Sequence, residues 1–403
     1  MKKIIALVIT MSLVFLVGCN NSNSSKKSED AILSKSYEEI AQSAKGTTVN
    51  FYGWGGNEVL NKWFDNYVVP NMKEKYNITV KRVGMDIDTI LNKLMSEKQA
   101  QNSKGTIDVV WLNGENFKTA KDNKLLFGPF LEKIVNYDKY VDKNSKDITT
   151  DFGTPVDNME APWGKATFTV VKDSAKVNSN IVNTSSLKEA IINNPGKFTY
   201  PAPPDFTGSA FVRNIIYDIV GYEKVANLPA DEAKVKEVIK PAMDYLNEIK
   251  PYLWNKGKTY PANTPQLNNM YSDNEVYFTM SYSPNEVAGK IKSGEFSKTS
   301  EFINFDKGNI SNTHFLAIPE NAQNKEGAMV LINYLTSIDA QASKSNPKNW
   351  GDMTILDLNK VPSEDRSKFY APVKIKNPVP EIKASLVPII EKIWMDEVAN
   401  KNE

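Results

Sequence analysis

Aromatic and acidic side chains recur in this sequence where predicted strands give way to predicted helices. Trp111 lies at the end of one such strand and Glu115 follows it, and Asp205 and Tyr282 follow others farther along the chain. An aromatic face stacks on a flat solute or holds a cation, and a carboxylate pairs with a positive charge. The set is therefore typical of recognition of a small polar molecule. The candidate binding residues are Trp54, Gly55, Trp111, Asn113, Glu115, Trp163, Asp205, Thr207, Ser209 and Tyr282.

Each candidate also has a purely structural interpretation, which the sequence leaves open. A tryptophan after a strand is often a core residue. Thr207 fits the N-cap of a helix, and Glu115 in a first turn favours the helix dipole. Asp205 lies in the proline-stiffened approach 201–206, which limits its freedom and favours a functional placement. His314, the single histidine, lies beside a predicted strand, and we expect a structural role for it.

The charge of the solute is also left open. Aromatic residues beside Glu115 and Asp205 favour a small organic cation. The helices predicted to begin at Ser209 and Asn285 would present free N–H groups, which suit an anionic oxygen. A zwitterion or a phosphorylated cation would use both features.

Enzyme motifs are absent from the sequence. It contains no Gly-x-Ser-x-Gly, no His-Glu-x-x-His and no phosphate-binding glycine-rich loop ending in Lys-Ser/Thr. We therefore expect no catalytic residue, no metal and no cofactor. The alternatives are a carboxylate-pair glycoside hydrolase, since Asp and Glu pairs are always available, and an adhesin or sensor. The last class would not need glycine-rich turns at strand ends in two separate lobes.

Alternating strand and helix patterns position these residues. Strands predicted over 48–52, 78–83 and 107–112 each lead into apolar residues at helical spacing, which indicates an α/β lobe with a parallel sheet. In such sheets ligands bind outside the carboxyl ends of the strands. A second α/β lobe is predicted from strands over 165–171, 198–200 and 275–280 and helices over 209–220 and 231–252.

The N-terminus resembles the leader of a bacterial lipoprotein. A basic start and an apolar run over 4–17 end in Leu16-Val17-Gly18-Cys19, the lipobox pattern, in which the cysteine is acylated and becomes the new N-terminus. Residues 20–30 contain no apolar side chain and are typical of a flexible spacer. We therefore expect a signal peptide over 1–18 and a lipid anchor at Cys19 on the extracellular face of the cytoplasmic membrane, carrying acyl chains such as palmitate.

The charge and cysteine content exclude some classes of partner and of stabilising bond. The 49 basic and 48 acidic residues give a net charge of +1, so no global field attracts nucleic acid. Cys19 is the only cysteine, so the folded body has no disulfide and must be stabilised by core burial. We expect a monomer.

Several blocks of the body resemble the YnjB-type extracellular solute-binding proteins of ABC importers. The resemblance covers roughly residues 47 to 370 and is carried by Phe51–Gly56, Gly105–Phe117, Leu126–Phe130, Asp151–Asp157, Glu160–Ala166 and Pro201–Arg213. It places the chain near the thiamine, iron and polyamine receptors. It implies a type II periplasmic-binding-protein-like fold, with two lobes, ligand in the cleft between them, and delivery to a permease and its ATPase.

The resemblance, together with the strand and helix patterns, predicts residue ranges for the lobes and a class of solute. We expect a lipid-anchored cysteine and spacer over 19–45, a first lobe from 46–165 plus 312–345, a second lobe over 166–311, and a C-terminal helical segment over 346–403. Each lobe is expected to hold a mainly parallel sheet flanked by helices. Hinge segments are expected near 164–170 and 312–318. The expected cargo is an organic cation or zwitterion, thiamine- or polyamine-like.

Overall fold

The computed structural model describes residues 30–371, 373 and 375–400. The chain divides into two compact units, Met1–Lys35 and Ser36–Glu403, and the fold below is that of the second. Cys19, the predicted signal peptide and most of the predicted spacer lie outside the described residues. Within the described part of the chain, every helix is too short or too polar to cross a membrane.

The larger sheet has the strand order β11-β10-β3-β1-β2, with β6 also paired to β10. β1 is parallel to β2 and β3, whereas β10 is antiparallel to β3 and β6 and parallel to β11. The three predicted N-terminal strands are thus confirmed as a parallel set. The strands are β1 Thr48–Gly53, β2 Thr79–Gly84, β3 Val109–Leu112, β6 Glu160–Thr167, β10 Asn309–Ala317 and β11 Pro378–Pro380.

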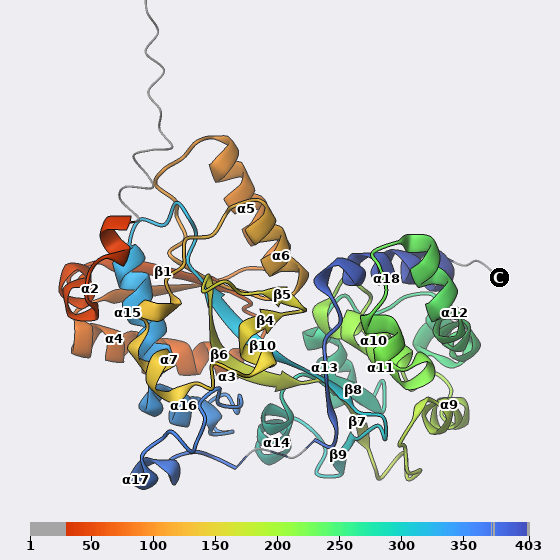
Figure 1. Ribbon diagram of the computed structural model, residues 1–403. Helices are drawn as coiled ribbons and strands as arrows, with labels where there is room; N and C mark the ends of the chain where they lie inside the picture. Colours follow the sequence, from red (N-terminus) through yellow and green to blue (C-terminus); the bar gives the residue numbers. More distant parts are fainter. Residues whose placement is uncertain (1–29, 372, 374, 401–403) are drawn as a thin grey trace, which may run out of the picture. The chain divides into compact units, whose positions relative to one another are not determined.

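Helices cover this sheet and form the first lobe (Figure 1). Apolar residues of α5 and α6, such as Leu94 and Phe117, pack against Val110 of β3 in one buried cluster. α15 packs beside β1 and contacts α2. The helices of this lobe are α2 Tyr37–Ala44, α3 Glu58–Trp63, α4 Val69–Tyr76, α5 Ile87–Gln99, α6 Glu115–Asp122, α7 Val135–Tyr140, α8 Lys146–Thr149, α15 Lys325–Leu335, α16 Ile338–Ser345 and α17 Ser363–Arg366, and the hairpin β4 Thr150–Asp151 with β5 Thr154–Pro155 accompanies them.

The second lobe is built on the sheet β8-β7-β9, at the right of Figure 1. Its helices enclose a large core that includes Phe211, Leu246 and Trp394. Its strands are β7 Thr169–Asp173, β8 Phe278–Ser281 and β9 Ser300–Ile303, and its helices are α9 Thr184–Asn193, α10 Phe206–Val220, α11 Tyr222–Ala226, α12 Glu232–Ile249, α13 Thr264–Ser272, α14 Pro284–Ser293 and α18 Val387–Trp394.

This second sheet differs from the mainly parallel sheet that the sequence predicts. Both β8 and β9 pair antiparallel with β7. The strand expected over 198–200 forms no ladder, although Phe198 O accepts a hydrogen bond from Trp254 N. The prolines at 201, 203 and 204 that follow have no N–H to donate, which explains why the segment does not continue as a strand.

Two long strands connect the lobes. β6 and β10 pair antiparallel from Glu160↔Ala317 to Thr167↔Ser311, with a register shift between His314 and Phe315. Beyond this ladder the chain enters β7, and Phe168 N donates to Ile310 O. Asn312 and His314 are two residues apart on β10, so they lie on the same face of the strand.

Helix α2 falls inside the range 19–45 that the sequence assigns to a flexible spacer. Ser36 and Glu39 form a capping box at its start, and Ile40 is fully buried. Tyr37 Oη accepts a hydrogen bond of 2.8 Å from Asn333 Nδ2 of α15. The apolar residues Ile40 and Ala44, four positions apart, give the helix a buried face. Residues from 36 onward therefore belong to the folded body.

Candidate functional site

Glu115 is the first residue of α6, directly after the turn that ends β3. Gly114 has a φ of +69°, and a Cβ there would lie 3.2 Å from the Phe152 ring, so glycine suits the turn in both respects. Gly114 N donates to Asp151 Oδ2, which fixes the turn. Glu115 Oε1 accepts from Asn116 Nδ2 at 3.2 Å, whereas Glu115 Oε2 is buried without a partner. Burial raises the pKa of Glu115 to about 7.

Asp205 is the N-cap of α10 in the second lobe. Its Oδ1 accepts from Thr207 N at 3.0 Å and from Gly208 N at 2.9 Å. The prediction that Thr207 caps this helix is therefore wrong, and the helix begins at Phe206, three residues before Ser209. The Asp205 carboxylate serves the first turn of α10, and burial raises its pKa.

A buried polar cluster lies on α10 and the C-terminal segment. Arg213 donates from Nε and Nη2 to the two carboxylate oxygens of Glu381, both at 3.0 Å, and from Nη1 to Ser209 Oγ at 2.6 Å. Ser209 Oγ in turn donates to Glu391 Oε1 at 2.6 Å. Tyr282 Oη lies 3.4 Å from Glu381 Oε1. Of these residues, positions at strand ends and helix starts predict Ser209 and Tyr282 but not Arg213, Glu381 or Glu391. The i,i+4 spacing of Ser209 and Arg213 was the available signal for the arginine.

The two lobes meet between Glu115 and this cluster. The charge of Arg213 lowers the pKa of Glu115, and the charges of Glu391 and Glu381 raise it. The Arg213 guanidinium lies 5.6 Å from the centroid of the Phe152 ring, next to the α6 turn. Burial raises the pKa of Tyr282 well above its usual range, and Glu115 is among the charges that add to the effect. The fold therefore brings Glu115, Ser209 and Tyr282 into one region.

Trp111, at the end of β3, packs against three other rings. Its ring centroid is 5.3 Å from that of Trp163, 5.1 Å from that of His314 and 5.9 Å from that of Trp350. Trp111 is partly exposed, whereas Trp163 is fully buried in the first lobe. Asn113, two residues after Trp111, is also partly exposed.

Trp54 and Gly55 follow β1. Trp54 is 41% exposed, and its ring lies over Gly56. A Cβ at Gly55 would lie 2.9 Å from the Gly84 Cα, so the two backbones approach too closely for a side chain. The turn after β1 therefore packs against the last residue of β2.

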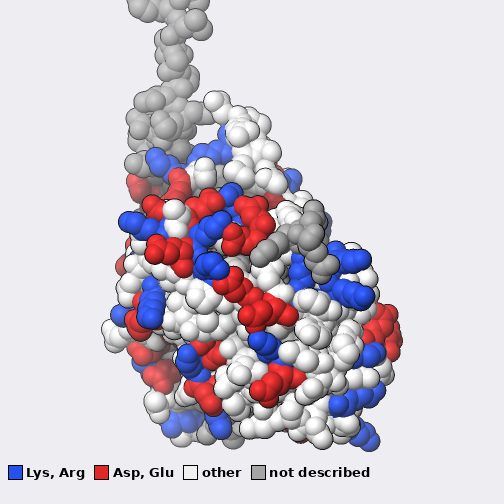
Figure 2. Space-filling model, turned by 90° about the vertical axis from the view of Figure 1, so that its right-hand side faces the viewer, with Lys and Arg blue, Asp and Glu red and all other residues white. Residues whose placement is uncertain are grey.

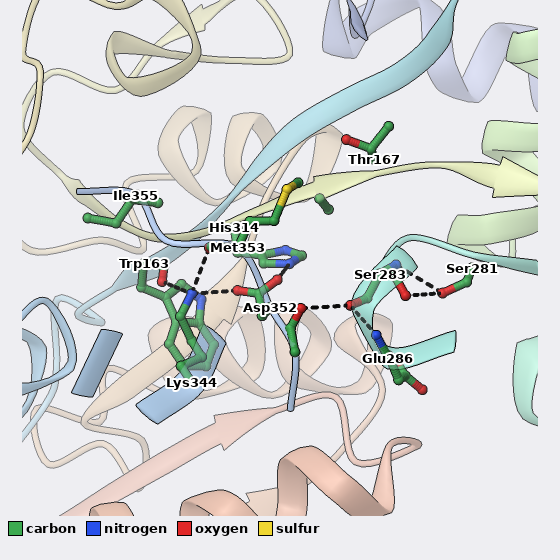
Figure 3. Close-up of polar contacts among 12 residues, drawn as sticks. Trp163, Thr167, Ser281, Ser283, Glu286, His314, Lys344, Asp352, Met353 and Ile355 are labelled. Carbon is green, nitrogen blue, oxygen red and sulfur yellow. Dashed lines mark hydrogen bonds and ion pairs between the residues drawn. The ribbon is translucent and has the colours of Figure 1, made fainter. Parts of the chain in front are cut away.

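A buried triad lies where β6 and β10 pair (Figure 3). Lys344 Nζ donates to Asp352 Oδ2 at 2.5 Å and to Trp163 O at 2.6 Å. His314 Nε2 lies 3.1 Å from Asp352 Oδ1, so the histidine has the structural role that its position predicts. Gly164 is opposite His314 in the ladder.

The segment that carries Asp352 of the triad contacts the second lobe at the start of α14. Ser283 caps α14 by accepting from Glu286 N at 3.3 Å, and its hydroxyl donates to Gly351 O at 3.4 Å. Burial raises the pKa of Glu286 to about 7, whereas Lys290 and a hydrogen bond from Asn57 lower it. Asn57 is the N-cap of α3, so this contact joins the two lobes.

Surface charge shows no dominant field on the face drawn in Figure 2, where acidic and basic side chains are interspersed. Among the described residues, no group of three or more His, Cys, Asp or Glu side chains could hold a metal ion.

The sequence matches a family of known proteins. A model of the family described as bacterial extracellular solute-binding protein matches residues 68–354. Protein YnjB of Escherichia coli strain K12 is 32% identical over 363 residues, which cover 89% of this chain and 93% of YnjB.

Solved structures share the fold at low sequence identity. One is the spermidine/putrescine ABC transporter substrate-binding protein PotD from Streptococcus pneumoniae, with a TM-score of 0.62, 14% identity, and coverage of 87% of this chain and 98% of that one. Another is the periplasmic binding protein AfuA from Actinobacillus pleuropneumoniae with fructose-6-phosphate bound, with a TM-score of 0.63, 13% identity, and coverage of 88% and 99%. The predicted type II periplasmic-binding-protein fold is confirmed, and the chain belongs to the family of bacterial extracellular solute-binding proteins.

Proposed function

We propose that this protein captures a small organic cation or zwitterion between its lobes and delivers it to the permease and ATPase of an ABC importer. The coarser assignment, solute binding, follows from the family. The finer one depends on the polar atoms that the two lobes present to each other.

Hydrogen-bond acceptors without donors carry this proposal. Glu115 Oε2 and Asn312 Oδ1 are both buried and unpartnered. Both belong to the environment of Glu381, because Asn312 Nδ2 donates to Glu381 Oε1 at 3.4 Å and Glu381 raises the pKa of Glu115. A buried acceptor without a donor costs about 1–3 kcal/mol, so the site favours a solute that brings N–H groups. A positive charge on that solute would also lower the pKa of Glu115 and keep its carboxylate ionised.

Aromatic residues would form the walls of the proposed solute site. Trp111 is partly exposed beside His314, and the Tyr282 ring lies 5.1 Å from Phe206. We propose Trp54, Trp111 and Tyr282 as walls and Glu115 as the charge partner. Asp205, Thr207 and Ser209 would support the site without contacting the solute. Asp205 caps α10, and the Ser209 hydroxyl is hydrogen-bonded to Arg213 and Glu391.

Two further features belong to the proposal. The lobes would close about β6 and β10 near 164–170 and 312–318, as hinged binding proteins do. The lipobox at Leu16-Val17-Gly18-Cys19 supports acylation of Cys19, which would keep the protein at the outer face of the cytoplasmic membrane.

A thermal-shift screen tests the proposal. The panel contains putrescine, spermidine and thiamine as cations, γ-aminobutyrate as a zwitterion and fructose-6-phosphate as an anion. A cation or zwitterion present at 100 times its Kd should stabilise the protein by about 2.7 kcal/mol. Glu115→Gln should weaken that binding at least about 30-fold, because a charge partner is lost, whereas Glu237→Gln, on the exposed face of α12, should not. Stabilisation by the sugar phosphate alone would contradict the proposed charge.

A further inference from the structure

A deeply buried ion pair beside Glu115 and Tyr282 at the lobe junction joins Arg213 to Glu381. Their side chains are 1% and 3% exposed. The guanidinium and the carboxylate meet through two parallel hydrogen bonds of 3.0 Å, the geometry in which an arginine is most fully neutralised. Burying such a pair brings little net stability, so its presence calls for another explanation.

Glu381 comes from the C-terminal segment, 168 residues from Arg213 in sequence. It follows β11, which pairs with β10 at Asn309–Ser311. Tyr282, after β8, and Asn312, in β10, both have side-chain donors 3.4 Å from Glu381 Oε1. This one carboxylate therefore contacts three elements that surround the proposed site.

Charges around the guanidinium compete for it. Arg213 attracts Glu115 from the first lobe, and in the second lobe it reaches Glu391 through Ser209. Arg213 is the positive charge that lowers the pKa of Glu115, so without Glu381 the guanidinium would be left to Glu115 and to Glu391, which it reaches through Ser209. Glu115 would then be paired within the protein and unavailable to a solute.

We propose that Glu381 is a positioning residue of the solute site, which neutralises Arg213 and so keeps Glu115 free to pair with a cationic group of the solute. This assignment rests on the proposed function for its purpose, but the charge balance itself exists in the protein alone. It gives the C-terminal segment a role in binding, beyond packing on the second lobe.

The directions of the pKa shifts agree with this arrangement. Glu381 acts with burial to raise the pKa of Glu115, and Arg213 opposes them. Glu381 is also the largest charge contribution that raises the pKa of Arg213. The other charges facing Glu115 are Glu391, on α18, and Asp151, on β4, whose pKa is itself raised by burial and by Glu115.

Titration of Glu115 in the solute-free protein tests the proposal. The side-chain carboxyl carbons of glutamate are labelled with ¹³C, and the Glu115 signal is assigned as the one missing from Glu115→Gln. In Glu381→Gln the pKa of Glu115 should fall by about one unit or more, because Arg213 loses its partner and attracts Glu115 instead. In the double variant Arg213→Met/Glu381→Gln it should return to the wild-type value or exceed it, because both opposing charges are gone.

The double variant separates positioning from folding. Its pair is replaced by uncharged side chains of similar size, a change that proteins often tolerate. If Glu381→Gln leaves the pKa of Glu115 unchanged or raises it, or if the double variant keeps the pKa low, the proposal is overturned. Binding of putrescine and spermidine, measured on the same proteins, would follow the same order if the proposed function also holds. A correct titration order without binding of any cation would refute only the proposed cargo.

Discussion

Replacing Gly164 by alanine should destabilise the protein more than replacing an exposed glycine such as Gly46 by alanine. A Cβ at this position would lie 1.9 Å from Asp352 Oδ2, 2.8 Å from His314 Cδ2 and 2.8 Å from Lys344 Nζ. All three atoms belong to the buried triad, in which the Lys344 side chain is 0% and the Asp352 side chain 1% exposed. The methyl group cannot be accommodated unless Asp352 moves away from Lys344.

The magnitude follows from that contact. Breaking a buried ion pair costs about 3–5 kcal/mol, and overpacking a core costs about 1–3 kcal/mol. We therefore expect Gly164→Ala to lower the free energy of unfolding by about 3 kcal/mol or more, measured by urea denaturation followed by circular dichroism. Gly46→Ala is the control, because Gly46 has a φ of +81° and no atom within 4 Å of a built Cβ, so only backbone strain of about 1–2 kcal/mol is expected. If Gly164→Ala costs no more than this control, Gly164 does not pack tightly against Asp352, His314 and Lys344.

Three other predictions concern the anchor, the hinge and the pH dependence. Cys19→Ser should release the protein to the medium, and a variant that still fractionates with membranes would refute the anchor. Small-angle scattering should show a smaller radius of gyration once a cation from the screen saturates the protein, whereas an unchanged profile would count against closure about β6 and β10. The folded-state pKa of Glu286 is raised to about 7, so its folded state holds a proton that the unfolded chain releases above its usual pKa of about 4.5. The solute-free protein should therefore lose about 1–3 kcal/mol of stability as the pH rises from about 4.5 to 7, and Glu286→Gln should reduce that loss; equal pH profiles would show that Glu286 is not buried at the lobe contact.

Local patterns predicted the first lobe better than the second. The strands near 48–52, 78–83 and 107–112 carry apolar runs typical of a covered parallel sheet, and the structure has them at Thr48–Gly53, Thr79–Gly84 and Val109–Leu112. The strands of the second lobe are equally apolar, but periodicity does not say which strand pairs with which, or in which direction. Their antiparallel order depends on β7 lying between β8 and β9, two strands far from it in the sequence.

The candidate site shows the same limit. Strand ends predict Glu115 and Tyr282 as binding residues; Tyr282 Oη lies 3.4 Å from Glu381 Oε1, and the charge of Glu381 raises the pKa of Glu115. It could not find Glu381 or Glu391, because their contacts with Arg213 and Ser209 span 168 and 182 residues. The N-cap of α10 cannot be predicted from the sequence for a different reason. Asp205 and Thr207 both have side chains that cap helices, and only the hydrogen bonds decide between them.

We propose above all that the lobe junction binds one cationic or zwitterionic solute through Glu115. Native mass spectrometry of the protein purified without denaturation tests it most directly, with wild type and Glu115→Gln prepared in parallel. We predict one small molecule per chain in the wild type, which carries a protonatable or quaternary nitrogen and is lost in Glu115→Gln. A bound anion without such a nitrogen, or a nitrogen compound retained equally by the variant, would contradict the claim.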